Sequence, residues 1–221
     1  LNVSLRPLCS ALALFFGTAY ADGGIVAGTM YKTGSLAVGK ESVSGENAAA
    51  VGDKAKAGGY KAAALGYDSA ASGLSATALG GESKAEALRS VAVGFRAHAK
   101  GTNDVAVGGA AAASGGQSVA VGLLSKASAL RAVAVGNGAQ ASNIDAVAIG
   151  RDSEADALSA TALGDRAKAR GTQSLALASA AEAEGYQAVA VGTRAVSNAV
   201  NSVALGVESS ATALNGLAVG T

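Results

Sequence analysis

The sequence predicts an all-β solenoid, in which short strands wind repeatedly around one long axis, and a repeated word of fourteen residues is the main reason. Taking the closing residue of each word as position zero, position −2 is alanine in every copy, and positions −3 and −1 are mostly Val, Leu or Ile. The closing residues are Gly39, Gly52, Gly66, Gly80, Gly94, Gly108, Gly122, Gly136, Gly150, Gly164, Ala178, Gly192, Gly206 and Gly220. Each unit is too small to bury a core alone, so the units must stack.

A coiled coil, which would also suit a multiple of seven residues, does not fit the pattern. Apolar residues occupy three neighbouring positions, and no Leu or Ile series keeps the alternating spacing of three and four that a coiled coil requires. A glycine recurs in almost every word, and each one inside a helix would cost about 1 kcal/mol relative to alanine.

Two strands per word fit better. We expect a first strand around positions −4 to 0, as in Ser90–Gly94, and a second around +2 to +6, as in Arg96–Lys100, where Ala or Ser alternates with polar residues. Glycine often stands at +7, as at Gly59 and Gly101, and this predicts a corner with a left-handed backbone. With coils stacked about 4.8 Å apart, the repeats would form a rod about 60 Å long.

The first strand is apolar on both faces, which suggests an interface. If its Val, Leu and Ile side chains fill the interior, its alanines form an apolar stripe along the outside, and a long exposed apolar patch usually marks a contact. We therefore expect the alanine column to pack against another chain, although the residues alone leave the number of chains open. The candidate interface residues are Ala92, Ala106, Ala120, Ala134, Ala148 and Ala162.

The chain divides into three segments. Residues 1–21 resemble a secretory signal peptide, with Arg6, an apolar run over residues 8–17 that is too short for a membrane span, and Ala19-Tyr20-Ala21 before a cleavage point. Residues 22–34 form a lead-in or cap, and residues 35–221 are the repeats. The only cysteine, Cys9, lies in the leader, so the remaining chain cannot form a disulfide.

Composition argues against an enzyme and against nucleic-acid binding. The formal net charge is +1, and no clustered basic face is evident. The only histidine, His98, should point outward. The repeats contain no second histidine and no cysteine that could complete a zinc site with it. No phosphate-binding loop, hydrolase elbow or aspartate ladder for calcium is present. We therefore expect no catalytic, metal-binding or cofactor-binding residues and no cofactor.

The words Ser90–Gly94, Asp104–Gly108 and Ser118–Gly122, followed by spaced Ala and Ser, resemble the head repeats of YadA-like trimeric autotransporter adhesins and related haemagglutinins. The resemblance covers about residues 35–221. It implies a left-handed parallel β-roll, a homotrimer, and exposure on the outer surface of a Gram-negative cell after secretion across the inner membrane. In that family a coiled-coil stalk and a trimeric β-barrel anchor the head in the outer membrane, and residues 35–221 match the head alone.

The resemblance also implies a function in adhesion. The best candidate for ligand binding is the word nearest to the family's collagen-binding form, comprising Asn201, Ser202, Val203, Ala204, Leu205 and Gly206. The expected partners are further copies of the chain and an extracellular matrix protein such as collagen, or another cell surface. The alternative is a structural spacer or fibre segment whose binding is carried elsewhere. An ice-binding surface is disfavoured, because the threonines do not form one ladder.

Overall fold

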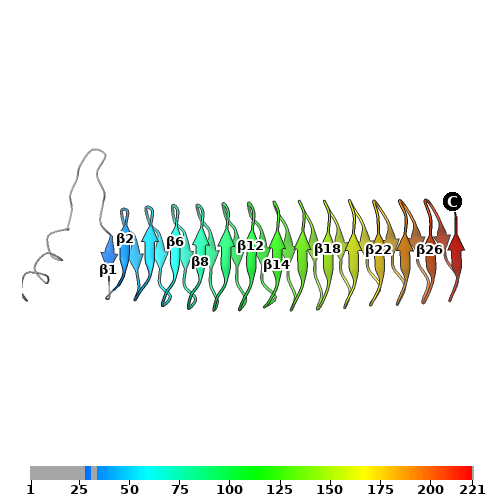
Figure 1. Cartoon of the computed structure of the whole chain (residues 1–221), viewed down its shortest axis with the longest axis horizontal. Coiled ribbons are helices and arrows are strands. Elements are labelled where there is room, and N and C mark those ends of the chain that lie inside the picture. The colour runs from blue at the N-terminus through cyan, green and yellow to red at the C-terminus, as the bar shows by residue number, and fades with distance from the viewer. Residues whose placement is uncertain (1–27, 31–33, 221) are drawn as a thin grey trace, which may run out of the picture.

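The computed structural model describes residues 28–30 and 34–220, which form a straight rod of stacked coils (Figure 1). The rod is built from two parallel sheets of 14 strands each. Each coil contributes one strand to each sheet, so neighbours within a sheet come from successive coils. The two sheets are called the even sheet and the odd sheet after the numbers of their strands. The predicted β-solenoid is confirmed.

The strands of the even sheet have three residues each: β2 (Leu36–Val38), β4 (Ala49–Val51), β6 (Ala63–Leu65), β8 (Thr77–Leu79), β10 (Val91–Val93), β12 (Val105–Val107), β14 (Val119–Val121), β16 (Val133–Val135), β18 (Val147–Ile149), β20 (Thr161–Leu163), β22 (Leu175–Leu177), β24 (Val189–Val191), β26 (Val203–Leu205) and β28 (Leu217–Val219). The strands of the odd sheet have two residues each: β1 (Thr29–Met30), β3 (Val43–Ser44), β5 (Lys56–Ala57), β7 (Ala70–Ala71), β9 (Lys84–Ala85), β11 (His98–Ala99), β13 (Ala112–Ala113), β15 (Lys126–Ala127), β17 (Gln140–Ala141), β19 (Glu154–Ala155), β21 (Lys168–Ala169), β23 (Glu182–Ala183), β25 (Val196–Ser197) and β27 (Ser210–Ala211). Both strands of a coil are shorter than the sequence pattern predicts.

The register aligns equivalent positions of successive words. Ala92 pairs with Ala78 on one side and with Ala106 on the other. Each side chain therefore lies over its counterpart in the next coil, and the fourteen-residue period becomes a set of straight columns along the rod.

The prediction that the alanine column forms the contact between chains is wrong. All six predicted interface residues are 0% exposed within a single chain: Ala92, Ala106, Ala120, Ala134, Ala148 and Ala162. They belong to one continuous interior cluster with the alanines in and next to the odd sheet, such as Ala99 and Ala97. The interior is so thin that only Ala and Ser occur at positions −4, −2, +3 and +5, apart from Asp104 and Gly216. The larger Val, Leu and Ile side chains therefore point outward.

The prediction of a left-handed backbone at position +7 is also wrong. Most residues with positive φ lie at +2 and +9, as at Arg96 (φ 57°) and Arg89 (φ 53°), in addition to the closing residues of the words. The turns containing these residues are closed by Ala97 N–H to Gly94 C=O and Ser90 N–H to Ala87 C=O, both 3.2 Å. The unfavourable backbone is held by a bond to the preceding coil, as from Arg89 N–H to the Leu74 carbonyl at 2.8 Å.

Glycine at +7 has a different cause, which is close packing. A Cβ added at Gly59 would overlap the carbonyl oxygen of Gly73, and one at Gly115 would overlap the carbonyl of Ala129. These glycines are needed where the backbone of one coil rests directly on the next, not for their conformational freedom.

The first complete coil has thirteen residues, and a corner absorbs the missing one. Val43 pairs with Lys56 and Leu36 with Ala49, each thirteen positions apart, whereas later partners are fourteen apart. Between Ser44 and Ala48 there are three residues, whereas four separate Ala57 from Ala62. The strands therefore keep their register when a corner shortens.

The predicted leader, residues 1–21, lies outside the described residues and stays a prediction. Within the predicted lead-in, β1 pairs in parallel with β3 through Thr29 and Val43, so the odd sheet begins before residue 35. No helix long and apolar enough to cross a membrane occurs in the part of the chain that the structure describes.

Candidate functional site

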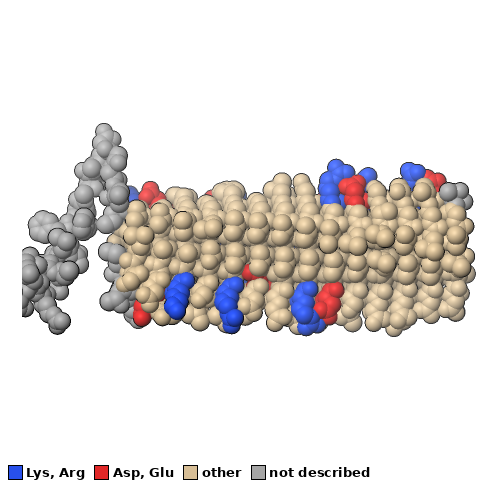
Figure 2. Space-filling view, in the orientation of Figure 1, with Lys and Arg blue, Asp and Glu red and all other residues tan. Residues whose placement is uncertain are grey.

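The outer face of the even sheet is apolar and uncharged along the whole rod. Its outward positions, −3 and −1, carry Val, Leu, Ile or Ala except at Thr77 and Thr161. Figure 2 views the rod from this side and shows a face that is almost free of charged side chains, which lie mostly along the two edges. Sequence reasoning assigned these side chains to the interior. The signal that could have placed them outside is the restriction of −2, +3 and +5 to Ala and Ser, which defines a narrow core.

An apolar ridge at position +8 borders this face at one corner. The ridge consists of the eight large side chains at this position that are exposed, to between 38% and 68%: Tyr60, Leu74, Leu130, Ile144, Leu158, Tyr186, Val200 and Leu214. Tyr60 is covered on one side by the ammonium group of Lys61, 5.2 Å from the ring centroid. Tyr60 and Tyr186 are both exposed at this corner, and the ridge widens the apolar surface beyond the sheet.

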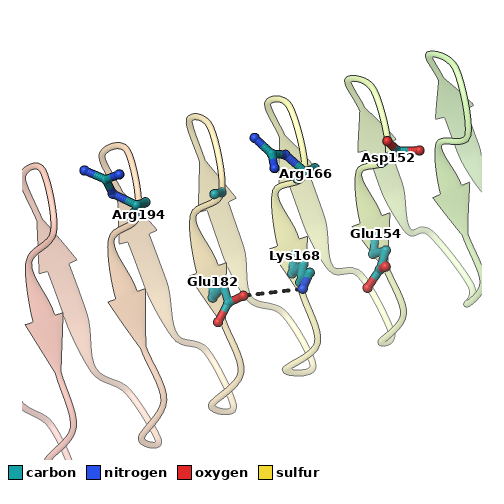
Figure 3. Close-up of a pocket in the computed structure, with 7 residues that line it drawn as sticks. Asp152, Glu154, Arg166, Lys168, Glu182 and Arg194 are labelled. Atoms are coloured by element: carbon teal, nitrogen blue, oxygen red, sulfur yellow. Dashed lines mark ion pairs between the residues drawn. The ribbon is translucent and has the colours of Figure 1, made fainter.

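The odd sheet has the opposite outer chemistry, since its outward side chains are mostly polar or charged. In the second half of the rod the charges are paired between successive coils. Lys168 Nζ lies 3.5 Å from Glu182 Oε1, and the two surround a shallow hollow with Arg166, Arg194 and Asp152 (Figure 3). Exposed pairs of this kind contribute little to stability individually.

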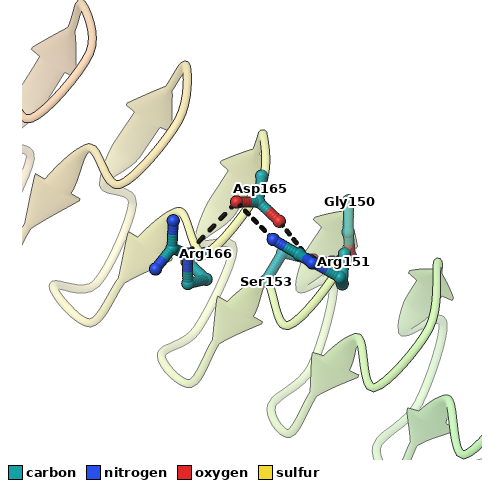
Figure 4. Close-up of polar contacts among 5 residues, drawn as sticks. All are labelled: Gly150, Arg151, Ser153, Asp165 and Arg166. Atoms are coloured by element: carbon teal, nitrogen blue, oxygen red, sulfur yellow. Dashed lines mark hydrogen bonds and ion pairs between the residues drawn. The ribbon is translucent and has the colours of Figure 1, made fainter.

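The corner beside this hollow carries a three-membered ion cluster. Asp165 lies between two guanidinium groups, with Arg151 Nε at 2.7 Å and Arg166 Nε at 3.1 Å (Figure 4). The hydrogen bond from Arg151 and the neighbouring positive charges hold the pKa of Asp165 below its usual value. In the same figure Ser153 Oγ donates to the carbonyl of Gly150 at 3.0 Å, which closes the turn beneath the cluster.

Two further arginines form ion pairs with carboxylates of other coils. Arg131 donates to Asp145 one coil away, which lowers the pKa of the Asp145 carboxyl and raises that of Arg131. Arg170 bonds both Glu154, at 2.8 Å, and Glu184, at 3.3 Å. Burial lowers the pKa of Arg170, but these two carboxylates raise it by more.

No arrangement suited to catalysis or metal binding occurs among the described residues. His98 Nε2 lies 2.9 Å from Glu86 Oε1, and no group of three or more potential metal ligands converges in residues 28–30 and 34–220. The buried Asp104 is fully engaged in the fold, because it accepts bonds from the N–H of Gly101 and from both the N–H and the hydroxyl of Ser118.

The family model for the YadA head domain repeat matches the chain seven times. The matches cover residues 44–69, 71–97, 99–125, 127–153, 155–177, 183–207 and 197–221. The chain belongs to the YadA head repeat family. YadA head repeats form the head region of trimeric autotransporter adhesins, which are displayed at the cell surface, and the family is not enzymatic. No curated protein matches the chain.

Within this YadA head, the structure separates the six residues of the candidate collagen-binding word. Ser202 is buried, and so is Ala204. Val203 and Leu205 are outward on the even sheet, whereas Asn201 is exposed at the corner, where its side-chain amide donates to Asn215 Oδ1 at 3.0 Å. The word therefore does not present one continuous recognition surface.

Proposed function

We propose that the chain is the head of a surface-displayed adhesin in which three copies pack through the outer faces of their even sheets. The observation that carries this proposal is the uncharged apolar face, which runs the length of the rod and is not covered by any other part of the described chain. Leu65, Ile149 and Leu205 are each about 40% exposed there. Burying such a face would remove apolar surface from water, which is the main driving force of association.

The size of the face supports association. With three residues per strand at about 3.3 Å each and fourteen strands about 4.8 Å apart, it measures roughly 10 by 60 Å, or about 600 Å². This reaches the upper end of the largest apolar patch found on ordinary monomers, before the ridge at position +8 is included. Three copies around one axis would cover this face on each chain and leave the odd sheets outward.

The adhesin function follows from repetition. A rod with equivalent surfaces along three chains can hold many weak sites, and their joint binding is far tighter than any one of them. We propose an extracellular matrix protein such as collagen, another cell or a surface as the partner, and display at the outer membrane of a Gram-negative cell after secretion across the inner membrane.

Association restricts the predicted collagen-binding word. If the even sheets pack together, Val203 and Leu205 are covered, and Asn201 is the only side chain of the word that can still reach a ligand. Binding through this word would then depend on Asn201 and on neighbouring side chains of the same corner.

Sedimentation of the exported protein tests the assembly. We expect a mass of three chains for the wild type and one chain for the double variant Val107→Lys/Val121→Lys, because two buried ammonium groups per chain would carry a large desolvation cost. The matched control is Ala70→Lys/Ala112→Lys, which adds the same charge to the odd sheet and should remain trimeric.

A folded wild-type protein that sediments as one chain would contradict the proposed trimer. Display is tested separately by antibody labelling of intact cells, and the absence of labelling at the cell surface would contradict the adhesin function while leaving the assembly untouched.

A further inference from the structure

The outward column of the odd sheet is cationic over the first half of the rod. The strand register places six residues in one line parallel to the axis, which we call the lysine file: Lys56, Ala70, Lys84, His98, Ala112 and Lys126. No acidic residue occurs in this file. The side chains of Lys56, Lys84 and Lys126 are all exposed.

The three lysines of the file lack ion-pair partners in the described part of the chain. The ion pairs there involve other cations, including Arg96 with Glu82 at 2.7 Å and His98 with Glu86 at 2.9 Å. Beside the file, the outward residues at position +2 are charge-balanced, since they are Lys54, Asp68, Glu82 and Arg96. These neighbours therefore leave the positive charge of the file uncancelled.

The same column has a different composition in the second half of the rod. There it continues as Gln140, Glu154, Lys168 and Glu182, and its one lysine is paired with Glu182 (Figure 3). Residues 40–136 contain ten Lys and Arg against seven Asp and Glu, whereas residues 137–220 contain five against eight. The first half thus keeps an excess of positive charge that the second half does not have.

The spacing of the lysines suits a linear ligand. Lys56 and Lys84 are two coils apart and Lys84 and Lys126 three, which gives separations of about 10 and 14 Å along a straight line. Two of the three residues between the lysines are alanines, and the third, His98, is held by Glu86 at 2.9 Å. Little therefore projects between the lysines to obstruct a chain lying along the rod. The only aromatic ring in the file is the imidazole of His98, so the file offers no series of rings on which successive nucleic-acid bases could stack.

We propose that the lysine file binds an anionic polysaccharide, a chain bearing repeated sulfate or carboxylate groups, aligned with the rod axis. Three lysines per protomer would each contact one anionic group, and binding would release counterions from the polymer. This inference deepens the proposed adhesin function by naming a ligand class, and it rests on that function only for its biological role. The file lies on the sheet opposite the proposed trimer face, so it is accessible in one chain or in three.

The test is titration of the exported full chain with heparin, a sulfated polysaccharide, and with uncharged dextran. We expect heparin to bind, dextran not to bind, and the affinity for heparin to fall steeply as salt is raised from 50 to 200 mM. The triple variant Lys56→Gln/Lys84→Gln/Lys126→Gln should lose affinity for heparin by about tenfold or more.

The matched control, Lys40→Gln/Lys61→Gln/Arg89→Gln, removes the same charge from corners in the same half of the rod. It should retain affinity within about twofold of the wild type, because these cations lie outside the file. Equal losses in the two triple variants would overturn the proposal, since net charge alone would then explain binding. The absence of heparin binding at 50 mM salt would also overturn it.

Single-stranded DNA serves as a second anionic probe. If DNA binds as tightly as heparin and is lost in the same variant, the assignment to polysaccharides is wrong. Circular dichroism and the sedimented mass, recorded on the same samples, distinguish a failure of this proposal from a failure of folding or of the proposed trimer.

Discussion

The strands of the even sheet present Val, Leu and Ile to the outside, whereas those of the odd sheet present Lys, Glu, Gln, His and Ala. Inward, the two sheets are almost identical, with Ala or Ser at nearly every position. The interior therefore sets the size of the repeat, and the outward positions are free to differ. One face can serve assembly and the other can meet solvent or a ligand.

The sharpest test of this division replaces an inward and an outward residue of the same strand, in separate variants, with leucine. Ala106 is 0% exposed and surrounded by other alanines, so Ala106→Leu should lower the free energy of unfolding by about 3 kcal/mol through overpacking. Val107→Leu, one residue further on and outward, should change it by less than about 1 kcal/mol. Urea unfolding followed by circular dichroism measures both, and equal effects would contradict the assignment of the two faces.

A second test concerns the corner glycines. Gly115→Ala should destabilise the protein by about 2 kcal/mol, because the new Cβ would overlap the carbonyl of Ala129 in the next coil. Gly58→Ala is the control, since a Cβ at Gly58 would meet nothing within 4 Å. It should stabilise slightly, by about 0.5 kcal/mol, through a less flexible unfolded chain. Indistinguishable urea midpoints for the two variants would mean that close packing does not explain the glycine at +7.

The smallest expected effect belongs to the ion pairs of the outer surface. The pKa of Asp165 is lowered in the folded state by Arg151 and Arg166, so its contribution to stability is present above the unfolded pKa of about 3.9 and is lost as pH falls through the folded pKa. The urea midpoint of Arg151→Gln should therefore lie slightly below that of the wild type at pH 6, and the two should converge near pH 2.

Salt provides the control for that measurement. Exposed pairs are screened, so the difference between the wild type and Arg151→Gln should also shrink in 1 M salt at pH 6. A difference that persists in both conditions would indicate that Arg151 stabilises the fold by packing instead of charge.

The fold could be predicted from the sequence because its evidence is repeated in every word. The period fixed the stacking of coils, and the alternation around Ala97 and Ala99 correctly placed both inside. The orientation of the first strand could not be obtained in this way. Both of its faces are apolar, and the decision between Ala92 and its valine neighbours depends on the width of the interior, which only the packing of the two sheets sets.

The corners and the charged surfaces were similarly beyond local reasoning. A glycine in a corner can meet either of two physical demands, a left-handed backbone or close approach of two backbones. The sequence does not say which one applies at +7. The residues of the lysine file are far apart in the sequence; Lys84 and Lys126, for example, are forty-two positions apart. They form one line only when the register of the strands is known. The handedness of the coil stays a prediction from the family resemblance.

The direction of the hydrogen bonds has a mechanical consequence for an adhesin. The bonds between successive coils, such as Val91 N–H to the Asp104 carbonyl at 2.9 Å, run along the rod instead of across it. Tension applied to the chain at one end therefore opens the bonds of the terminal coil before it loads those behind. Each coil that peels away releases up to about 48 Å of extended chain. A head pulled by its ligand would then yield in steps and absorb work coil by coil, while the coils still stacked retain their shape.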